Sequence, residues 1–116
     1  MQTTALTLAQ LQHQVDDWIR TVGVRYYSPL TNLAILTEEV GEVARILARR
    51  YGDQSEKPSD AAKDLGEELA DVLFVVLALA NQTGVDLEKS FQEGMTKRTK
   101  RDADRHRNNP KLHPVD

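Results

Sequence analysis

Hydrophobic residues recur every three or four positions along most of the chain, which is the spacing of amphipathic helices. No stretch alternates hydrophobic and polar residues for long, so we expect no strands. Residues that favour turns divide the pattern into four parts. The predicted helices cover residues 7–22, 29–50, about 59–81 and 86–103. The predicted fold class is therefore an all-α bundle of about four helices.

Local signals mark where these helices begin. Ser28 can accept a hydrogen bond from the first turn of the second helix, and Pro29 suits the first helical position because its missing N–H needs no partner there. Asp86 is a favourable cap for the fourth helix. Residues 51–58 are polar and contain Gly and Pro, so we expect a loop. Residues 1–105 are expected to form a single domain, followed by a flexible tail over residues 106–116.

The second half of the third predicted helix, residues 72–80, is hydrophobic on every side. Such a helix has to be buried all round. A chain of 116 residues has too small a core to bury it alone, so we expect the central helices to lie in a subunit interface. Nine hydrophobic residues in a row are also too few to span a bilayer.

Composition narrows the classes of function. The 18 acidic residues outnumber the 15 basic ones, and a net charge of −3 argues against nucleic acid or a membrane as a partner. The absence of cysteine excludes disulfides, Cys-based zinc sites and a thiol nucleophile. The N-terminus lacks the basic and apolar segments of a signal peptide, so a cytoplasmic protein is expected.

Acidic residues interrupt a hydrophobic row on each of the two middle helices. The row reads Ile35, Glu39, Glu42 and Ile46 on the second helix, and Ala61, Asp64, Glu68, Asp71, Val75 and Ala78 on the third. Residues three apart on a helix point in similar directions, so Glu39 pairs with Glu42, and Glu68 with Asp71. If the two helices pack antiparallel, four carboxylates face a shared gap.

None of these four carboxylates has a Lys or Arg four residues C-terminal to it. Converging carboxylates without cationic partners have raised pKa values or bind a metal, and an all-oxygen set favours Mg²⁺, Mn²⁺ or Ca²⁺. From spacing alone, the alternative of two solvated, acid-rich helix faces stays open. A di-iron site is not expected, because no Glu is followed by His three residues later.

These acidic residues belong to two sequence motifs that match those of a known protein family. The segment Glu38-Glu39-Val-Gly-Glu42 matches an EExxE motif, and Glu68-Leu-Ala-Asp71 matches an ExxD motif in the setting EELADVLF. With these motifs and their separation, the sequence resembles the MazG-type all-α nucleotide pyrophosphohydrolases from about residue 28 to residue 102.

The resemblance implies a function and a set of roles. Family members hydrolyse nucleoside triphosphates to a monophosphate and pyrophosphate, use Mg²⁺ (with Mn²⁺ as a substitute), and form homodimers or dimer-of-dimers tetramers. By resemblance, Glu39, Glu42, Glu68 and Asp71 are the metal ligands, and these residues together with Glu38 form the catalytic set. Either Glu38 or Glu42 is expected to orient the attacking water, and Glu38 alternatively supports the metal ligands from outside.

The family also carries a basic stretch on its last helix that contacts phosphates. Lys97 and Arg101 match that stretch, whereas Gly94 and Arg98 replace residues that the family usually has. Lys97 and Arg101 are four residues apart and share a face, so both are candidate substrate-binding residues. Without the resemblance, a solvated helix end is the favoured interpretation of this cluster.

The base pocket is less well defined. Trp18, Tyr26 and Tyr27 precede the second helix and could stack on a base, with Trp18 as the leading candidate, although such residues are more often core or interface. Two alternative functions stay open. One is hydrolysis of phosphoribosyl-ATP, dUTP or dCTP by an enzyme of the same superfamily, and the other is a non-enzymatic oligomeric helix bundle.

Overall fold

The computed structural model describes residues 5–113, and in this range all regular secondary structure is helical. Five α-helices are followed by one short 3-10 helix: α1 Leu8–Thr21, α2 Pro29–Arg50, α3 Pro58–Ala61, α4 Leu65–Gln82, α5 Leu87–Asp102 and η1 Pro110–Leu112. The prediction of an all-α fold is confirmed. No strand is present in the described residues.

Side-chain caps fix three of the helix starts where the sequence predicted them. The Thr7 side chain accepts from the backbone N–H of Gln10 at the start of α1. Ser28 Oγ accepts from the Thr31 N–H at 3.2 Å at the start of α2. The Asp86 carboxylate accepts from the N–H of the third residue of α5 at 3.1 Å. Each bond satisfies a backbone donor that has no partner within its helix.

The third predicted helix is divided into α3 and α4. Asp64 has φ −96° and ψ 114°, outside the helical region, and its carboxylate caps α4 by accepting from the Gly66 N–H at 2.8 Å. Asp60, which would have been at the start of one long helix, is instead buried in α3. α4 therefore begins about six residues later than the periodicity predicts, because tertiary contacts of Asp60 hold α3 apart from it.

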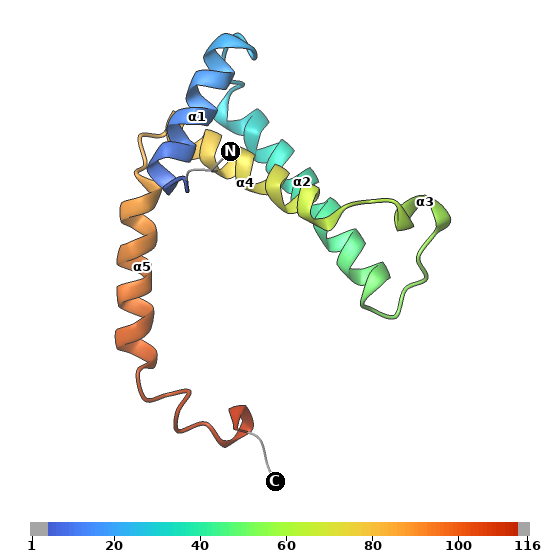
Figure 1. Cartoon of the computed structure of the whole chain (residues 1–116), viewed down its shortest axis with the longest axis vertical. Coiled ribbons are helices and arrows are strands. Elements are labelled where there is room, and N and C mark those ends of the chain that lie inside the picture. The colour runs from blue at the N-terminus through green and yellow to red at the C-terminus, as the bar shows by residue number, and fades with distance from the viewer. Residues whose placement is uncertain (1–4, 114–116) are drawn as a thin grey trace.

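α2 and α4 lie side by side and run in opposite directions, and α1 packs across the second half of α4 (Figure 1). The core is formed by Val15 and Ile19 of α1 against Leu77 and Ala78 of α4. After α4 the chain turns at Gly84, whose φ of +69° is easily reached only by glycine. α5 then extends away from the other helices, bent by 107° from α4 (Figure 1).

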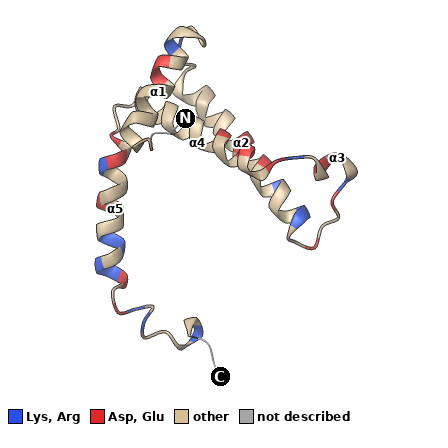
Figure 2. Cartoon of the chain, in the orientation of Figure 1, with Lys and Arg blue, Asp and Glu red and all other residues tan. Residues whose placement is uncertain are grey.

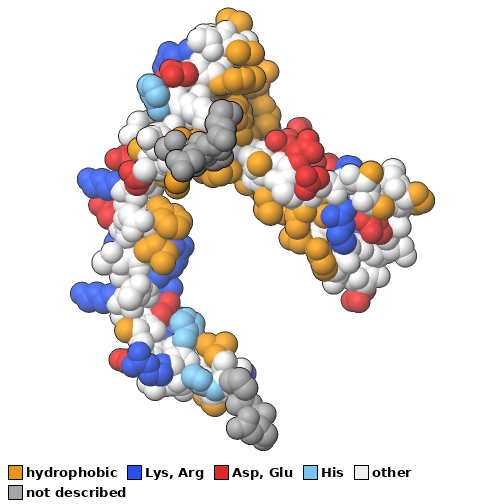
Figure 3. Space-filling view, viewed as in Figure 1, with side chains coloured by type: hydrophobic (Ala, Val, Ile, Leu, Met, Phe, Trp, Pro, Cys, Tyr) orange, Lys and Arg blue, Asp and Glu red, His pale blue; other side chains and the backbone are white. Residues whose placement is uncertain are grey.

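The chain is much more extended than its length requires. Its radius of gyration is 18.5 Å, whereas a compact domain of this length has about 13 Å. Large hydrophobic side chains remain exposed along α2, α4 and α5, including Leu33, Val40, Leu47, Leu69, Leu73, Phe91 and Met95. Figure 3 shows hydrophobic side chains along the arm formed by α2 and α4, and a second patch on α5.

The hydrophobic half of α4 is only partly covered within one chain. Val75, Leu77, Ala78 and Ala80 are buried, but Leu73 and Phe74 remain exposed. No single helix in residues 5–113 is long and apolar enough to cross a membrane, and α4 passes that test only when it is joined across its bend to α5.

Candidate active site

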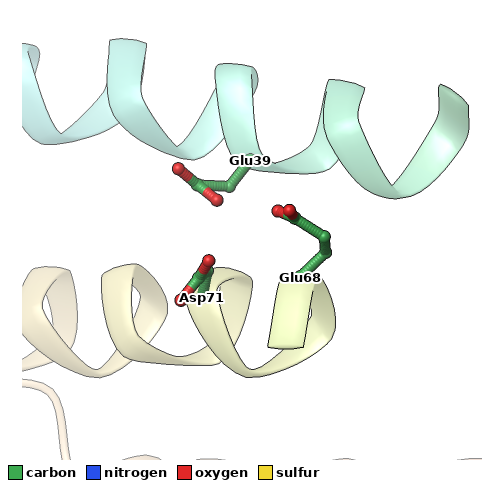
Figure 4. A group of neighbouring side chains, drawn as sticks. All are labelled: Glu39, Glu68 and Asp71. Atoms are coloured by element: carbon green, nitrogen blue, oxygen red, sulfur yellow. The ribbon is translucent and has the colours of Figure 1, made fainter. Parts of the chain in front are cut away.

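Three of the four predicted metal-binding carboxylates meet between α2 and α4. Glu39 comes from the middle of α2, and Glu68 and Asp71 come from the first two turns of α4. One carboxylate oxygen of each lies within 4.8 Å of the other two. Figure 4 shows the three side chains pointing into the space between the two helices. The antiparallel packing of α2 and α4 brings about this convergence, as the spacing predicted.

The electrostatics of this cluster favour a bound cation. Burial raises the pKa of Glu39, and the negative charges of Asp71, Glu68, Glu42 and Glu38 raise this pKa further. None of the ion pairs within residues 5–113 involves Glu39, Glu68 or Asp71. A converging, uncompensated set of oxygen ligands fits a hard divalent ion such as Mg²⁺ or Mn²⁺.

Glu42, the fourth predicted ligand, has a different partner. The Nζ atom of Lys63 lies 3.0 Å from a carboxylate oxygen of Glu42, and both side chains are about 40 % exposed (37 % and 43 %). Lys63 comes from the short segment between α3 and α4. Glu42 is therefore next to the three-carboxylate cluster but held by a lysine, and its role as a metal ligand stays a prediction. Glu38 is exposed, and its role in positioning water also stays a prediction.

Arginines at the end of α2 hold the segment that carries Lys63. Asp60 accepts from Arg45 Nε at 3.2 Å and lies 3.6 Å from Arg49 Nη1. Arg45 also holds the pKa of Asp60 below its usual range. Arg50 donates to the backbone carbonyls of Asp60 and Lys63, at 3.2 and 2.7 Å. These contacts place the ammonium group of Lys63 beside Glu42, and sequence spacing gave no signal for them.

A cavity of about 410 Å³ opens directly from the carboxylate cluster, with Glu39 and Asp71 in its wall. Four aromatic side chains line it, and they come from α1, the α1–α2 connection and α4: Trp18, Tyr26, Tyr27 and Phe74. The Trp18 ring meets the Phe74 ring edge to face, with 5.7 Å between centroids. The structure thus brings the predicted aromatic candidates to the acidic site. Sequence reasoning did not single out Phe74, Arg25 or Asn32, which also line the cavity.

A partly buried polar cluster fixes the aromatic wall of the cavity. The Tyr26 hydroxyl donates to Asp16 of α1, and this bond lowers the pKa of Asp16. Arg20 Nε lies 3.0 Å from the same carboxylate, and its guanidinium carbon lies 5.6 Å from the centre of the Tyr26 ring. Burial raises the pKa of Tyr26, and the bond to Asp16 adds to this effect. The connection between α1 and α2 is thereby held against α1.

The two predicted phosphate-binding residues do not reach the site within one chain. Lys97 and Arg101 lie on α5, and both are exposed. Figure 2 shows the basic residues of α5 on a helix that points away from the acidic centre of α2 and α4. Arg101 pairs instead with the neighbouring Asp102 at 2.8 Å, and this contact lowers the pKa of Asp102 to about 2.

Comparison with known proteins places this geometry in a family. Residues 27–106 match the MazG nucleotide pyrophosphohydrolase domain. The chain belongs to the MazG family. It is 41 % identical to YpjD, an uncharacterized protein of Bacillus subtilis (strain 168), over 99 residues that cover 85 % of this chain and 89 % of YpjD. It is 31 % identical to YvdC of the same organism, over 80 % of this chain and 96 % of YvdC.

Solved structures of MazG relatives share the fold. The crystal structure of YpjD from Bacillus subtilis has a TM-score of 0.72 and 40 % identity, over 82 % of this chain and 95 % of that one. A Bacillus-conserved MazG protein, described as a nucleotide pyrophosphohydrolase, has a TM-score of 0.67 and 39 % identity, over 82 % of this chain and 92 % of its own. The MazG chain described here is therefore an enzyme of the nucleotide pyrophosphohydrolase class, and the alternative of a non-enzymatic bundle is set aside.

Proposed function

We propose that this MazG protein hydrolyses nucleoside triphosphates between the α- and β-phosphates, releasing a nucleoside monophosphate and pyrophosphate in a Mg²⁺-dependent reaction. The proposal rests on one observation, which is that the acidic cluster and the aromatic cavity adjoin each other. The acidic cluster of Glu39, Glu68 and Asp71 lies at the wall of an aromatic cavity of about 410 Å³. A phosphate chain bound at the cluster would leave its base among the aromatic side chains.

The carboxylates would hold the metal at the phosphate end of the site. Glu39, Glu68 and Asp71 are the ligands, with Glu42 as a fourth. When bound, Mg²⁺ neutralises phosphate charge and lowers the pKa of a water molecule. Mn²⁺ is a suitable substitute because the ligand set is all oxygen.

We assign the role of proton acceptor in the proposed reaction to Glu38. The water oxygen bonds to phosphorus, the bridging P–O bond of the α–β anhydride breaks, and the bridging oxygen leaves with the electron pair. One proton of the water passes to a carboxylate. Glu42 is paired with Lys63, whereas Glu38 lies on the same turn of α2 and is exposed. We therefore assign the proton to Glu38, which takes part in no ion pair within residues 5–113.

A second copy of the chain would complete the phosphate site. A triphosphate carries more negative charge than one or two divalent ions neutralise, so cationic side chains are needed. We assign this role to Lys97 and Arg101 of a partner chain, because α5 carries them away from the acidic cluster of its own chain. Support comes from the extended shape and from the hydrophobic residues left exposed on α2, α4 and α5. The assembly is a homodimer or a dimer of such dimers.

Pyrophosphate release tests the proposal. The purified chain is given a panel of standard and modified nucleoside triphosphates, including dUTP, dCTP and phosphoribosyl-ATP, with and without Mg²⁺. Turnover that is confined to phosphoribosyl-ATP or to dUTP would replace the proposed substrate class by that alternative.

A nucleoside triphosphate substrate also agrees with the expected cytoplasmic location.

Matched variants test the carboxylates. Glu68→Gln and Asp71→Asn are expected to lower kcat by about 100-fold or more, because each removes a charge that holds the metal. Glu67→Gln is the control, since Glu67 precedes Glu68 on α4 but is exposed and stands outside the cluster. Equal turnover of Glu68→Gln and Glu67→Gln would overturn the ligand assignment.

A further inference from the structure

Asn32 is a buried polar side chain in the wall of the aromatic cavity. It lies in the first turn of α2, is only 6 % exposed, and lines the same cavity as Trp18 and Phe74. Ile35 and Glu39, three and seven residues later, line this cavity too. Asn32 and Glu39 are therefore on one face of α2, about 10 Å apart along its axis. One end of the cavity is acidic, and the other end presents a carboxamide.

Hydrogen bonds fix which end of the Asn32 carboxamide is free. Gln82 Nε2 donates to the backbone carbonyl of Tyr27, and a carbonyl can only accept, so the Gln82 amide has one orientation. Its Oε1 must then face Asn32, and it accepts from Asn32 Nδ2 at 2.8 Å. Asn32 Oδ1 has no hydrogen-bond partner among residues 5–113 and is not sealed from solvent. The cavity therefore presents an oriented hydrogen-bond acceptor.

We propose that Asn32 Oδ1 reads the base and makes the site selective for nucleotides with an exocyclic amino group at C4 of a pyrimidine or C6 of a purine. This inference rests on the proposed function. Cytosine and adenine offer an N–H donor at that position, and uracil and hypoxanthine offer a carbonyl oxygen. A carbonyl would face Oδ1 lone pair to lone pair, and the amide cannot turn over without losing its bond to Gln82. Cytidine and adenosine nucleotides are thus the preferred class.

Two pairs of nucleotides of similar shape, CTP with UTP and ATP with ITP, test the base selectivity of the wild-type chain. We expect kcat/KM to be about tenfold or more higher for CTP than for UTP, and for ATP than for ITP, because a buried acceptor without its donor is unfavourable. Binding of CMP and UMP without metal, measured by calorimetry, should show the same order. If all four triphosphates are hydrolysed and the kcat/KM ratios of CTP to UTP and of ATP to ITP both lie within twofold of one, the inference is overturned and the proposed function stays intact. If none is hydrolysed, the proposed function fails, and the CMP and UMP affinities still decide the inference.

Variants of Gln82 test whether base selectivity depends on the orientation of the Asn32 amide and not only on its presence. Gln82 does not line the cavity and can act on the base only through Asn32 or through Tyr27, whose backbone carbonyl it holds. Gln82→Met frees the Asn32 amide to turn, so the CTP/UTP ratio should fall to about one to three, with CTP turnover largely retained. Gln82→Glu loses the donor to the Tyr27 carbonyl, as Gln82→Met does, but still accepts from Asn32 Nδ2, so it should keep the ratio near the wild-type value. Gln54→Met, the same change as Gln82→Met at an exposed loop position, is the control. A wild-type ratio in Gln82→Met, in a variant whose Tm shows that it is folded, would overturn the inference.

Discussion

The ammonium group of Lys63 lies 3.0 Å from the carboxylate of Glu42, one helical turn from Glu39 in the acidic cluster. The lysine thus pairs with the carboxylate that we propose as the fourth ligand of a metal. A divalent ion that recruits Glu42 competes with Lys63 of the segment between α3 and α4 for that carboxylate.

Removing this lysine should strengthen metal binding. Lys63→Met frees Glu42, and because a partly exposed ion pair contributes up to about 1 kcal/mol, we expect the Kd for Mn²⁺ to fall about two- to fivefold. Electron paramagnetic resonance of free Mn²⁺ gives the Kd directly. Lys57→Met is the control, since Lys57 is exposed and lies directly before α3. In the Glu42→Gln background the gain should vanish, and a gain that persists there would contradict this account.

Trp18, the only tryptophan of the chain, should report on base binding. It lines the cavity and is 50 % exposed, so its face is free for stacking. Stacking of a base on an aromatic ring contributes about 1–3 kcal/mol, so Trp18→Ala should raise KM about 5- to 100-fold with little change in kcat. Nucleotide binding should also change the intrinsic fluorescence. Trp18→Phe, which keeps an aromatic face, should recover most of the affinity, and equal KM values for the two variants would argue against stacking.

Local chemistry explains which parts of the fold could be predicted. Ser28 and Pro29 are neighbours in sequence and act on the adjacent turn, so the start of α2 could be predicted to the residue. The convergence of Glu39 with Glu68 and Asp71 followed from helix periodicity once antiparallel packing was assumed. The cap depends on neighbouring residues, and the convergence depends on the position of each acid on its own helix together with one assumption about packing.

The remaining features depend on partners far apart in the chain. Gln82 orients Asn32 across 50 positions, and nothing near Asn32 signals this contact. Lys63 reaches Glu42 because arginines of α2 bind the carboxylate and backbone of Asp60, a contact that periodicity cannot reveal. The same buried carboxylate divides a stretch that the hydrophobic pattern predicted to be one helix.

Acid should weaken the fold through Asp60. Its pKa is held below the usual range in the folded chain, mainly by Arg45, so the unfolded chain takes up a proton first as pH falls. The stabilisation is therefore fully present above the unfolded pKa of about 4 and is lost as pH drops below it. Urea unfolding from pH 7 to pH 3 should show Asp60→Asn less stable at pH 7, with the difference from wild type shrinking toward pH 3. Asp53→Asn, at an exposed loop position, is the control. A difference that does not vary with pH would rule out the ion pair as its cause.

Mixing two inactive variants should restore activity if the partner chain supplies the phosphate site. Arg101→Ala alone should lose about 100-fold in kcat, since it removes a cationic group from the transition state. Glu39→Gln should lose at least as much through the metal site. In a mixed dimer, Glu39 of the Arg101→Ala chain faces the intact Arg101 of the Glu39→Gln chain, so one of the two sites is complete.

Random exchange of subunits in a C2 dimer then predicts recovery of about a quarter of wild-type activity. The exchange is carried out by mild denaturation and refolding of the mixture, and sedimentation equilibrium gives the oligomeric state before and after it. Each variant refolded alone is the control. If Arg101 served its own chain, every site in the mixture would lack either Arg101 or Glu39. Dimers that mix without any recovery would therefore contradict the assignment of α5 to the partner's active site.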